Sequence, residues 1–405
     1  MKLSEELTWR GFVGKNTFDD LGELDRGDKT FYWGVDPSSD SMTIGNLAAA
    51  MLAIHFIRAG HKGILLAGGA TGQVGDPKDD AERALKTLDE IAKNKAGIKS
   101  QFETIFRDEK FTLVDNYDWF KEMHYLDFLR DIGKHFSMTQ LLDREFVKSR
   151  IGADGDGLSY AEFSYSLIQG YDFLHLFREY GVTLQLCGED QFGNSVSGMQ
   201  LIRKLENAKA DVFGMPLIVN KSTGKKFGKS EGGAIWLSAA KTSPFQFYQF
   251  WLNVDDAGVI DYLKIYTFLS REEIEEIAKD HFAKPELRAA QKVLAHEVTV
   301  LVHGEMAAKN VEHVSRILFG ENDFREISDD ELEILAREIP TIDLRENLTA
   351  VDALTEAKTA NSRGEAMRLI QQNAVAMNGK KIAGDETIRE KSLLKKGKNQ
   401  FVLVK

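Results

Sequence analysis

Short apolar segments alternate with longer helical stretches from the start of the chain to about residue 220. The expected strands are residues 30–35, 63–67, 111–114, 183–187 and 216–219. This alternation predicts an α/β domain with a Rossmann-like, doubly wound parallel sheet and helices on both faces. Ligands of such sheets bind at the carboxyl ends of the strands. The loops that carry Asp36, Asp76 and Asp190 are therefore expected to share one edge.

After residue 220 the sequence pattern of the 405-residue chain changes twice, first to a helical region and then to a tail of mixed helix and strand. Residues 244–318 have helical periodicity and no clear strand. An acidic stretch containing Pro340 follows, and the tail begins as a helix over 363–372 and then alternates toward strands at 374–377 and 401–404. The expected organisation is a catalytic domain (1–220), a lysine loop (221–235), an α-helical domain (236–320), a linker (321–347) and a small α+β domain (348–405).

Composition narrows the class of protein. Cys187 is the only cysteine, which excludes an intrachain disulfide and argues against a thiolate zinc site. No apolar run is long enough to span a bilayer and the N-terminus lacks a signal-peptide pattern, so a cytoplasmic protein is expected. The net charge is −11, but residues 351–405 carry eleven Lys and Arg against six Asp and Glu. This local basic excess favours contact with phosphates in the tail.

Two separated segments are suited to hold the phosphates of a nucleotide. Residues 36–46 leave a strand and enter a small-residue helix at Gly45, which gathers the hydroxyls of Ser38 and Thr43 at a helix N-terminus. Residues 226–230 add the ammonium groups of Lys226 and Lys229 on a glycine-containing loop. The pair indicates ATP activation with pyrophosphate as leaving group. Lysine-rich surface turns are also common, so this loop alone would not carry the interpretation.

Two further segments are ambiguous by themselves. The glycine turn of residues 68–77 has neither a Walker ending nor dinucleotide spacing, and such a turn is more often structural, although Asp76 at its end could take an ammonium group. Tyr165, Gln169 and Asp172 fall at helical spacing and form a polar stripe, which on one helix alone is more often a solvated face. Residues 187–194 follow a strand and open another helix at the same expected edge.

Taken together, these motifs resemble the bacterial-type tyrosyl-tRNA synthetases, which are class I enzymes, along nearly the whole chain. The matching segments are residues 7–11, 32–37, 68–77, 165–172, 190–194 and 226–230. Residues 362–370 with 375–379 resemble an S4-type RNA-binding domain. Several ordered motifs in one chain are far more specific than any one of them.

The resemblance implies a tyrosine–tRNA ligase (EC 6.1.1.1) that forms tyrosyl-adenylate and passes the tyrosyl group to the terminal adenosine of tRNA(Tyr). Tyr32 and Asp172 would bind the phenolic hydroxyl of L-tyrosine, a device that rejects phenylalanine and for which tyrosyl enzymes are themselves the standard example. The other implied tyrosine-binding residues are Asp36, Asp76, Tyr165, Gln169 and Gln191. The implied ATP-binding and catalytic residues are Ser38, Thr43, Gly45, Asn46, Asp190, Lys226, Lys229 and Ser230.

The resemblance also implies partners. Mg²⁺ would arrive on ATP, with no dedicated metal site on the protein, and the family is homodimeric. The implied RNA contacts are Arg363, Arg368, Lys380 and Lys381, with Lys395, Lys396 and Lys398 as secondary candidates. Each of these surface side chains could equally be only solvated.

The chain departs from the family pattern at two places. The signature His-Ile-Gly-His is replaced by residues 43–46, in which Thr43 and Asn46 stand for both histidines, and Phe192 stands where Trp is usual. Threonine and asparagine keep neutral hydrogen-bond donors but lose the imidazoles. Two alternatives stay open: a tryptophanyl-tRNA synthetase, which shares the class I core, and a catalytically weak synthetase-like scaffold that binds RNA.

Overall fold

The computed structural model describes the whole chain except residues 77–84, 143–144, 152–156, 231–232 and 398. The chain forms two compact units. The first comprises residues 1–242 and 254–294, and the second comprises residues 243–253 and 295–405.

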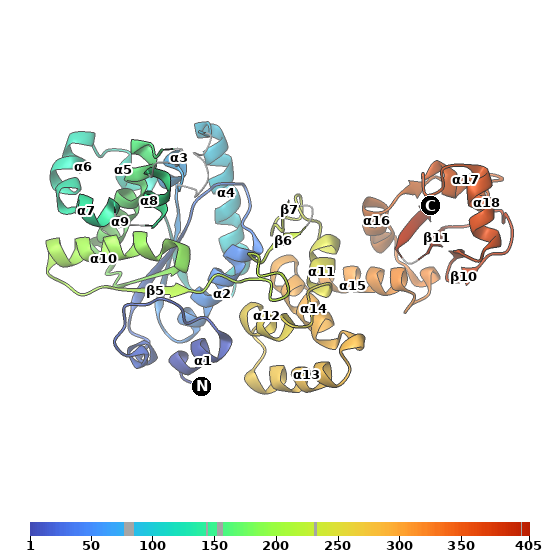
Figure 1. Cartoon of the computed structure of the whole chain (residues 1–405), viewed down its shortest axis with the longest axis horizontal. Coiled ribbons are helices and arrows are strands. Elements are labelled where there is room, and N and C mark those ends of the chain that lie inside the picture. Colours follow the sequence, from blue (N-terminus) through green and yellow to red (C-terminus); the bar gives the residue numbers. More distant parts are fainter. Residues whose placement is uncertain (77–84, 143–144, 152–156, 231–232, 398) are drawn as a thin grey trace. The chain divides into compact units, whose positions relative to one another are not determined.

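The first unit is built on a parallel sheet (Figure 1). Its five strands are β1 (Thr30–Val35), β2 (Lys62–Ala67), β3 (Phe111–Asp115), β4 (Leu184–Gly188) and β5 (Asp211–Met215), in the spatial order β3-β2-β1-β4-β5. The predicted Rossmann-like parallel fold is confirmed. The direction of winding reverses between β1 and β4, and such a switch point is where open sheets of this kind bind ligands.

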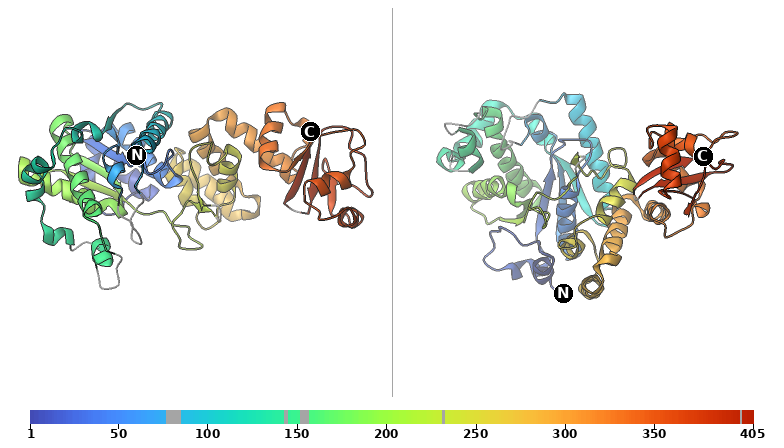
Figure 2. Two further views of the ribbon diagram at one scale, coloured as in Figure 1. Left: turned by 90° about the horizontal axis from the view of Figure 1, so that it is seen from above. Right: turned by 45° about the vertical axis from the view of Figure 1, so that its right-hand side comes forward.

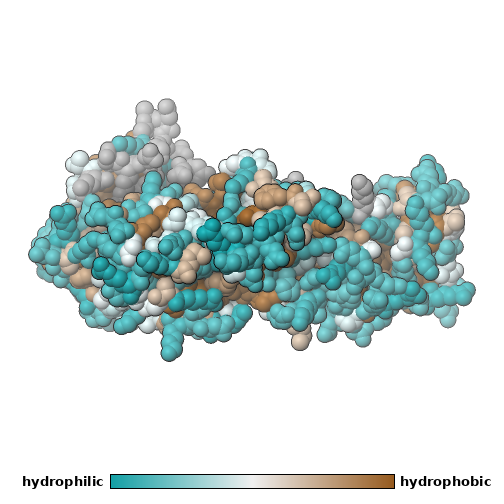
Figure 3. All heavy atoms as spheres, turned by 90° about the horizontal axis from the view of Figure 1, so that it is seen from below, coloured by the Kyte–Doolittle hydropathy of each residue, from teal (hydrophilic) through white to brown (hydrophobic). Residues whose placement is uncertain are grey.

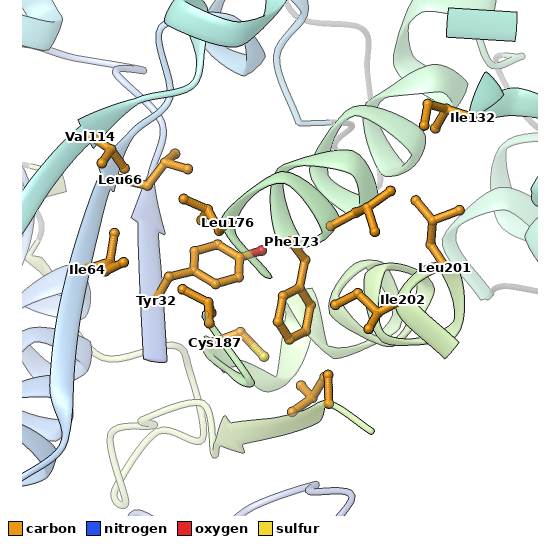
Figure 4. Close-up of a cluster of buried hydrophobic side chains, with 14 residues drawn as sticks. Tyr32, Ile64, Leu66, Val114, Ile132, Phe173, Leu176, Cys187, Leu201 and Ile202 are labelled. Atoms are coloured by element: carbon orange, nitrogen blue, oxygen red, sulfur yellow. The ribbon is translucent and has the colours of Figure 1, made fainter. Parts of the chain in front are cut away.

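Helices cover both faces of this sheet (Figures 1 and 2). Those on one face are α2 (Ile44–Arg58) and α4 (Leu88–Ile105), and those on the other are α9 (Tyr160–Tyr180) and α10 (Phe192–Glu206). Side chains of β1 alternate between the faces as the strand period requires. The Phe31 ring lies 5.6 Å from the Phe56 ring of α2, tilted by 59°. Tyr32 instead joins the core beneath α9, with its ring 5.4 Å from Phe173 (Figure 4).

Helix α9 has clear start and stop signals, and glycines lie where it packs against α10. It begins with a capping box between Ser159 and Glu162 and ends at Gly181, whose φ of 67° suits glycine. A Cβ added at Gly198 would lie 2.8 Å from the Phe173 Cβ and 3.2 Å from the Gly170 carbonyl oxygen. Glycines at the crossing therefore let the two helices approach and fix the side of α9 that faces the sheet edge.

The fifth strand was predicted at residues 216–219, and this prediction is wrong. The strand is β5 (Asp211–Met215), which precedes Pro216. The sequence does not indicate this strand, because it contains Asp211 and Gly214 and both residue types are unfavourable in strands. Asp211 is buried against Lys29, with Nζ 3.3 Å from Oδ2, and a Cβ at Gly214 would lie 2.8 Å from the Lys15 carbonyl oxygen. The apolar residues after Pro216 form a loop at the sheet edge instead.

Several smaller elements complete the first unit. They are α1 (Leu3–Arg10), α3 (Thr71–Val74), α5 (Tyr117–Phe120), α6 (Tyr125–Asp131), α7 (Met138–Leu142), α8 (Glu145–Ile151), α12 (Val259–Tyr266), α13 (Arg271–Ala283), and the hairpin β6 (Lys229–Ser230) with β7 (Gly233–Ala234). The buried Arg10 guanidinium joins α1 to α12 by donating to the carbonyls of Lys264 (2.7 Å), Thr267 (3.0 Å) and Leu269 (2.8 Å). The boundary expected at residue 236 therefore differs from the compact units, since α12 and α13 belong with the sheet.

The second unit combines helices with a small mixed sheet. Its helices are α11 (Pro244–Leu252), most of α14 (Ala289–His303), α15 (Glu305–Phe319), α16 (Asp329–Glu338), α17 (Ala350–Glu356) and α18 (Arg363–Gln371). Its strands are β8 (Thr341–Ile342), β9 (Val375–Met377), β10 (Lys380–Lys381), β11 (Ser392–Lys396) and β12 (Gln400–Val404), in the spatial order β10-β9-β11-β12-β8. Leu354, Ile370 and Leu394 form part of its core.

The small sheet extends beyond the residues expected for the C-terminal domain. Strand β8 lies in the expected linker and pairs in parallel with β12. Strand β11 was also not expected from the sequence. Its Leu393 and Leu394 are both buried and Lys395 and Lys396 follow them, so the alternation that marks a strand is absent.

No helix among the described residues is long and apolar enough to cross a membrane. On the face drawn in Figure 3, hydrophilic side chains cover most of the surface and hydrophobic ones gather in small groups.

Candidate active site

A cavity of about 460 Å³ opens at the carboxyl ends of β1 and β4, the switch point of the sheet. Most of the residues predicted to bind tyrosine and ATP line it. They are Tyr32, Asp36, Ser38, Thr43, Gly45, Asn46, Asp76, Tyr165, Gln169, Asp172, Asp190, Gln191 and Lys226. Lys229 and Ser230 form β6 directly after the lysine loop's Gly228, and their side chains lie outside what the structure describes.

Asp36 follows β1 and is held by hydroxyl groups. Its Oδ1 accepts from Thr71 Oγ1 at 2.6 Å and its Oδ2 accepts from Tyr165 OH at 2.8 Å. A Cβ at Gly68 would lie 2.3 Å from both Asp36 Oδ1 and Thr71 Oγ1. The glycine turn therefore has a role at the site, because it lets the backbone approach the carboxylate closely.

A cluster of acceptors lies on the same part of the cavity. Asp76 Oδ2 accepts from Gln191 Nε2 at 2.8 Å. The Gln169 Oε1 atom is buried and has no hydrogen-bond partner among the described residues. Burial raises the pKa of Tyr165 well above its usual value, and the nearby carboxylates of Asp36 and Asp76 raise it further. Two carboxylates and an open carbonyl oxygen form a site suited to an ammonium group.

A second polar group reaches the cavity from β1 and α9. The Tyr32 hydroxyl, which points toward α9 in Figure 4, is buried without a partner among the described residues. Asp172 is 2 % exposed, and its Oδ1 and Oδ2 accept from Trp119 Nε1 at 2.9 Å and Asn116 Nδ2 at 3.1 Å. Burial raises the pKa of Asp172 to about 8 despite these two donors. A hydroxyl ligand could pair with both Tyr32 and Asp172.

Three residues that contribute to the cavity or its support were missed from the sequence. Asn116 donates to both Thr71 Oγ1 (3.1 Å) and Asp172, and therefore links the two carboxylate sites. It directly follows β3, so the rule that ligands gather at the carboxyl edge could have found it. Gln185 lies beside Tyr32 in the sheet, and its Oε1 is also unpartnered among the described residues. Nothing in the local pattern around Trp119 indicates its role.

Thr43 and Asn46, which replace the signature histidines, bond to each other at the start of α2. Asn46 Oδ1 accepts from the Thr43 amide at 3.0 Å and from Thr43 Oγ1 at 3.1 Å. The backbone donor fixes the orientation of the Asn46 amide, because its oxygen must face that N–H group. Its Nδ2 is consequently the end that can donate to a ligand.

The segment that precedes α2 is attached to the chain that follows the lysine loop. The Leu237 amide donates to the Met42 carbonyl at 2.9 Å, and the Ser238 amide donates to Ser41 Oγ at 3.0 Å. Lys241 Nζ donates to Ser39 Oγ at 2.6 Å and contacts Asp40 Oδ1 at 2.5 Å. This ion pair is the largest cause that lowers the pKa of Asp40. The two predicted phosphate-binding segments are therefore parts of one structure.

Lys226 brings a positive charge to the cavity. Its Nζ lies 3.8 Å from Asp190 Oδ2, and the two side chains are 60 % and 47 % exposed. An ion pair this exposed is weak, so the ammonium group can turn to a ligand at low cost.

The predicted RNA-contact residues belong to the second unit. Arg368, Lys380 and Lys381 are exposed, and Arg363 forms an ion pair with Asp352. Lys395 and Lys396 are partly buried and donate to the carbonyls of Leu318 and Thr359. Lys398 lies outside the described residues. Both strand lysines are therefore held by neutral carbonyl oxygens and, among the described residues, not by carboxylates.

Comparison with known proteins agrees with this site. The family model described as "tRNA synthetases class I (W and Y)" matches residues 25–320, and "Tyrosine--tRNA ligase SYY-like C-terminal domain" matches residues 331–405. A tyrosine–tRNA ligase of Pediococcus pentosaceus is 42% identical over 390 residues, which cover 94% of this chain and 92% of the relative. One from Streptococcus thermophilus is 41% identical over the full length of both chains.

Solved structures give the same answer for the first part of the chain. A C-terminally truncated mitochondrial tyrosyl-tRNA synthetase of Aspergillus nidulans matches with a TM-score of 0.70 and 30% identity, covering 78% of this chain and 94% of that one. The chain therefore belongs to the class I tRNA synthetases and, within them, to the tyrosine–tRNA ligases.

Proposed function

We propose that this chain activates L-tyrosine with ATP and transfers it to tRNA(Tyr), using the residues around the cavity. The observation that carries the proposal is the pair formed by the unpartnered Tyr32 hydroxyl and the buried Asp172 in a cavity that also holds Asp36 and Asp76. A phenol at one side and an ammonium group at the other satisfy both sets of groups. Phenylalanine would leave the Tyr32 hydroxyl without a partner and would offer Asp172 no third donor beside Trp119 and Asn116, and this penalty provides the selection.

In the activation step, the tyrosine carboxylate attacks the α-phosphorus of ATP. A phosphorus–oxygen bond forms to the carboxylate, the bond to the β-phosphate breaks, and pyrophosphate leaves with the electron pair. Asp76, Tyr165 and Gln169 hold the ammonium group, Gln191 lies near the carboxylate, and Asp36 lies beside the reacting group. The site acts by orientation and by charge, so it needs no protein nucleophile.

The phosphates of ATP, with Mg²⁺ carried on them, would meet the start of α2 and the lysine loop. Ser38, Gly45 and Asp190 contribute to the nucleotide site, and Thr43 and Asn46 supply neutral donors in place of imidazoles. Lys226, Lys229 and Ser230 would stabilise the charge that develops on the departing pyrophosphate. The Asn46 Nδ2 orientation supports this role, since its oxygen already accepts from Thr43.

The second unit is proposed to bind tRNA(Tyr) through an S4-like C-terminal domain and the helices that precede it. The exposed Arg368, Lys380 and Lys381 support this role, as does Arg363, which is paired with Asp352 but is 65 % exposed. Such contacts with phosphates weaken as salt rises. Charging of tRNA for translation would take place in the cytoplasm.

We propose that the protein forms a homodimer. Several large apolar side chains on α6 to α9 of the first unit are exposed, and two of them, Tyr125 and Tyr160, bond to each other through their hydroxyls at 3.3 Å. Exposed apolar surface supports a contact with a second copy of the chain. The exposed side chains are Tyr125 (60 % exposed), Leu126 (74 %), Met138 (56 %), Leu142 (40 %), Ile151 (52 %) and Tyr160 (60 %). Sedimentation of wild type and of Leu126→Glu tests this proposal, because a charge in the contact should produce monomers.

Tyrosine-dependent exchange of pyrophosphate into ATP tests the activation step. The assay is run without tRNA in parallel reactions with tyrosine, tryptophan and phenylalanine. Exchange with tyrosine alone supports the proposal. Exchange with tryptophan would overturn the pocket assignment, and no exchange by folded protein would favour an RNA-binding scaffold.

A further inference from the structure

The start of the lysine loop belongs to a short hairpin, residues 218–227, here called the loop hairpin. The Phe227 amide donates to the Ile218 carbonyl at 2.8 Å, and Val219 forms a bridge with Lys226. The turn is closed by the Asn220 amide, which donates to the Lys225 carbonyl at 2.8 Å. The loop hairpin therefore determines where the backbone of Lys226 lies.

Helix α12 contacts Phe227 of the loop hairpin through the rings of Tyr262 and Tyr266, and the Tyr266 ring is the more distant at 6.1 Å between centroids. The rings of Phe227 and Tyr262 are stacked at 4.1 Å between centroids with an interplanar angle of 24°. The Tyr262 hydroxyl also donates to the Val219 carbonyl at 3.4 Å. Tyr262 thus contacts both strands of the hairpin, and Asp261 beside it forms an ion pair with Lys221 in the turn.

The start of α12 is shaped to admit the Tyr262 ring. A Cβ at Gly258 would lie 2.6 Å from Tyr262 Cζ and 2.7 Å from its hydroxyl oxygen. Tyr262 is 1 % exposed and Phe227 is 7 % exposed, so the stacked pair is shielded from water. A larger residue at Gly258 would have to displace the ring.

We infer that Tyr262 is a positioning residue for ATP activation, because its ring fixes Phe227 and through it the hairpin that carries Lys226 to the cavity. This inference rests on the proposed function. Tyr262 lies 36 positions after Lys226 in the sequence and does not line the cavity, so it cannot act on the substrate directly. Its contribution depends on the stack, which aligns the lysine before the pyrophosphate begins to leave.

The first test compares Tyr262→Leu with Tyr262→Phe and with Leu263→Ala. Leu263 is a fully buried neighbour on the same helix and is the control for a general loss of packing. We expect Tyr262→Leu to lower the kcat of pyrophosphate exchange about tenfold, the factor that one aromatic pair can supply. Tyrosine binding measured by equilibrium dialysis without ATP should not change. Tyr262→Phe keeps the stack and should stay within about twofold of wild type.

A double-mutant cycle tests whether the stack carries the effect. Phe227→Leu alone should resemble Tyr262→Leu, and the double variant should be no worse than either, because each substitution removes the same contact. Additive losses would overturn the inference. A loss of tyrosine affinity in parallel with kcat, or an equal loss of kcat in Leu263→Ala, would also overturn it, because both indicate a general structural role.

Limited trypsin cleavage provides a readout that does not depend on activity. The fragments produced by cleavage after Lys221, Lys225 and Lys226 are followed by mass spectrometry. Tyr262→Leu should accelerate these cleavages in a protein whose thermal unfolding is still cooperative, whereas Tyr262→Phe should not. Unchanged cleavage in folded Tyr262→Leu would overturn the inference. If wild type itself showed no exchange, the proposed function would fail, and the cleavage rates would still decide whether Tyr262 positions the hairpin.

Discussion

The amino-acid pocket and the lysine loop line the same cavity but differ in burial. Tyr32 and Asp172 are each 2 % exposed, and both oxygens of Asp172 already have donors. The Lys226 side chain is 60 % exposed, and its partner Asp190 is 47 % exposed. Recognition of a hydroxyl requires groups that are costly to leave unpaired, which only a buried, rigid pocket provides. A cation that must move toward developing charge needs only a weak ion pair in the resting site, such as the exposed one between Lys226 and Asp190.

Asp172→Ala should have the largest effect and should break the pocket. Tyrosine-dependent kcat/KM should fall about 150-fold, because the substrate hydroxyl loses a buried partner at up to about 3 kcal/mol. Asn116 and Trp119 also lose a partner, in the free enzyme as well as with substrate bound, so their loss lowers stability. Discrimination between tyrosine and phenylalanine should decrease with it. Exchange assays with both amino acids measure the effect. Tyr171→Phe, which removes a hydroxyl from the neighbouring position of α9, is the control, and strong tyrosine preference in Asp172→Ala would refute the pocket assignment.

Lys226→Ala should alter the function of the exposed lysine loop and leave the amino-acid pocket intact. We expect the kcat of exchange to fall about a hundredfold, since a group aimed at developing charge contributes mainly in the transition state. Tyrosine binding in the absence of ATP should be unchanged. Lys225→Ala, on the exposed neighbour, is the control and should behave like wild type. A fall in tyrosine affinity in Lys226→Ala would show that the two halves of the cavity are not separable.

The buried carboxyl group also predicts a pH dependence of stability. The pKa of Asp172 is raised by burial from 3.8 to about 8. Between these values the folded protein holds a proton that the unfolded chain has released, so stability falls as pH rises, by up to about 1.4 kcal/mol per pH unit. Asp172→Asn removes this contribution. Denaturant unfolding from pH 5 to pH 8 measures the free energy of unfolding of both proteins. Wild type should lose stability relative to Asp172→Asn as pH rises. A difference between the two proteins that stays constant over this range would contradict the raised pKa of Asp172.

The smallest effect concerns the attachment between the two phosphate-binding segments. Lys241→Met should raise the KM for ATP up to about fivefold, because an ion pair that is one-third exposed contributes no more than about 1 kcal/mol. The KM for tyrosine should not change. Lys93→Met is the matched control, since Lys93 lies 3.9 Å from the same Asp40 and is 78 % exposed. Equal effects of the two substitutions would show that only the net charge near Asp40 matters.

Much of the fold and site could be predicted because it depends on local pattern. Strand β1 has the predicted bounds, because it is mostly apolar and the loop after it leads to the clear N-terminus of α2. Tyr165, Gln169 and Asp172 were predicted as one face of a helix, and they line one cavity. Strand β5 was misplaced because Asp211 is stabilised there by Lys29, a partner more than 180 positions away. Trp119 was missed for the same reason, since its bond to Asp172 has no counterpart in the local pattern.

The sequence by itself determined the alternation of strands and helices, the motifs and therefore the family, because periodicity and loop chemistry act over a few residues. Only the tertiary structure decided which side of the polar stripe is buried, how Asp172 is held, and that α12 stacks on the lysine loop. These features depend on side chains far apart in the chain whose distances and burial are set by packing. A sequence shows which chemical groups are present, whereas the folded chain decides which of them remain unpaired in a cavity.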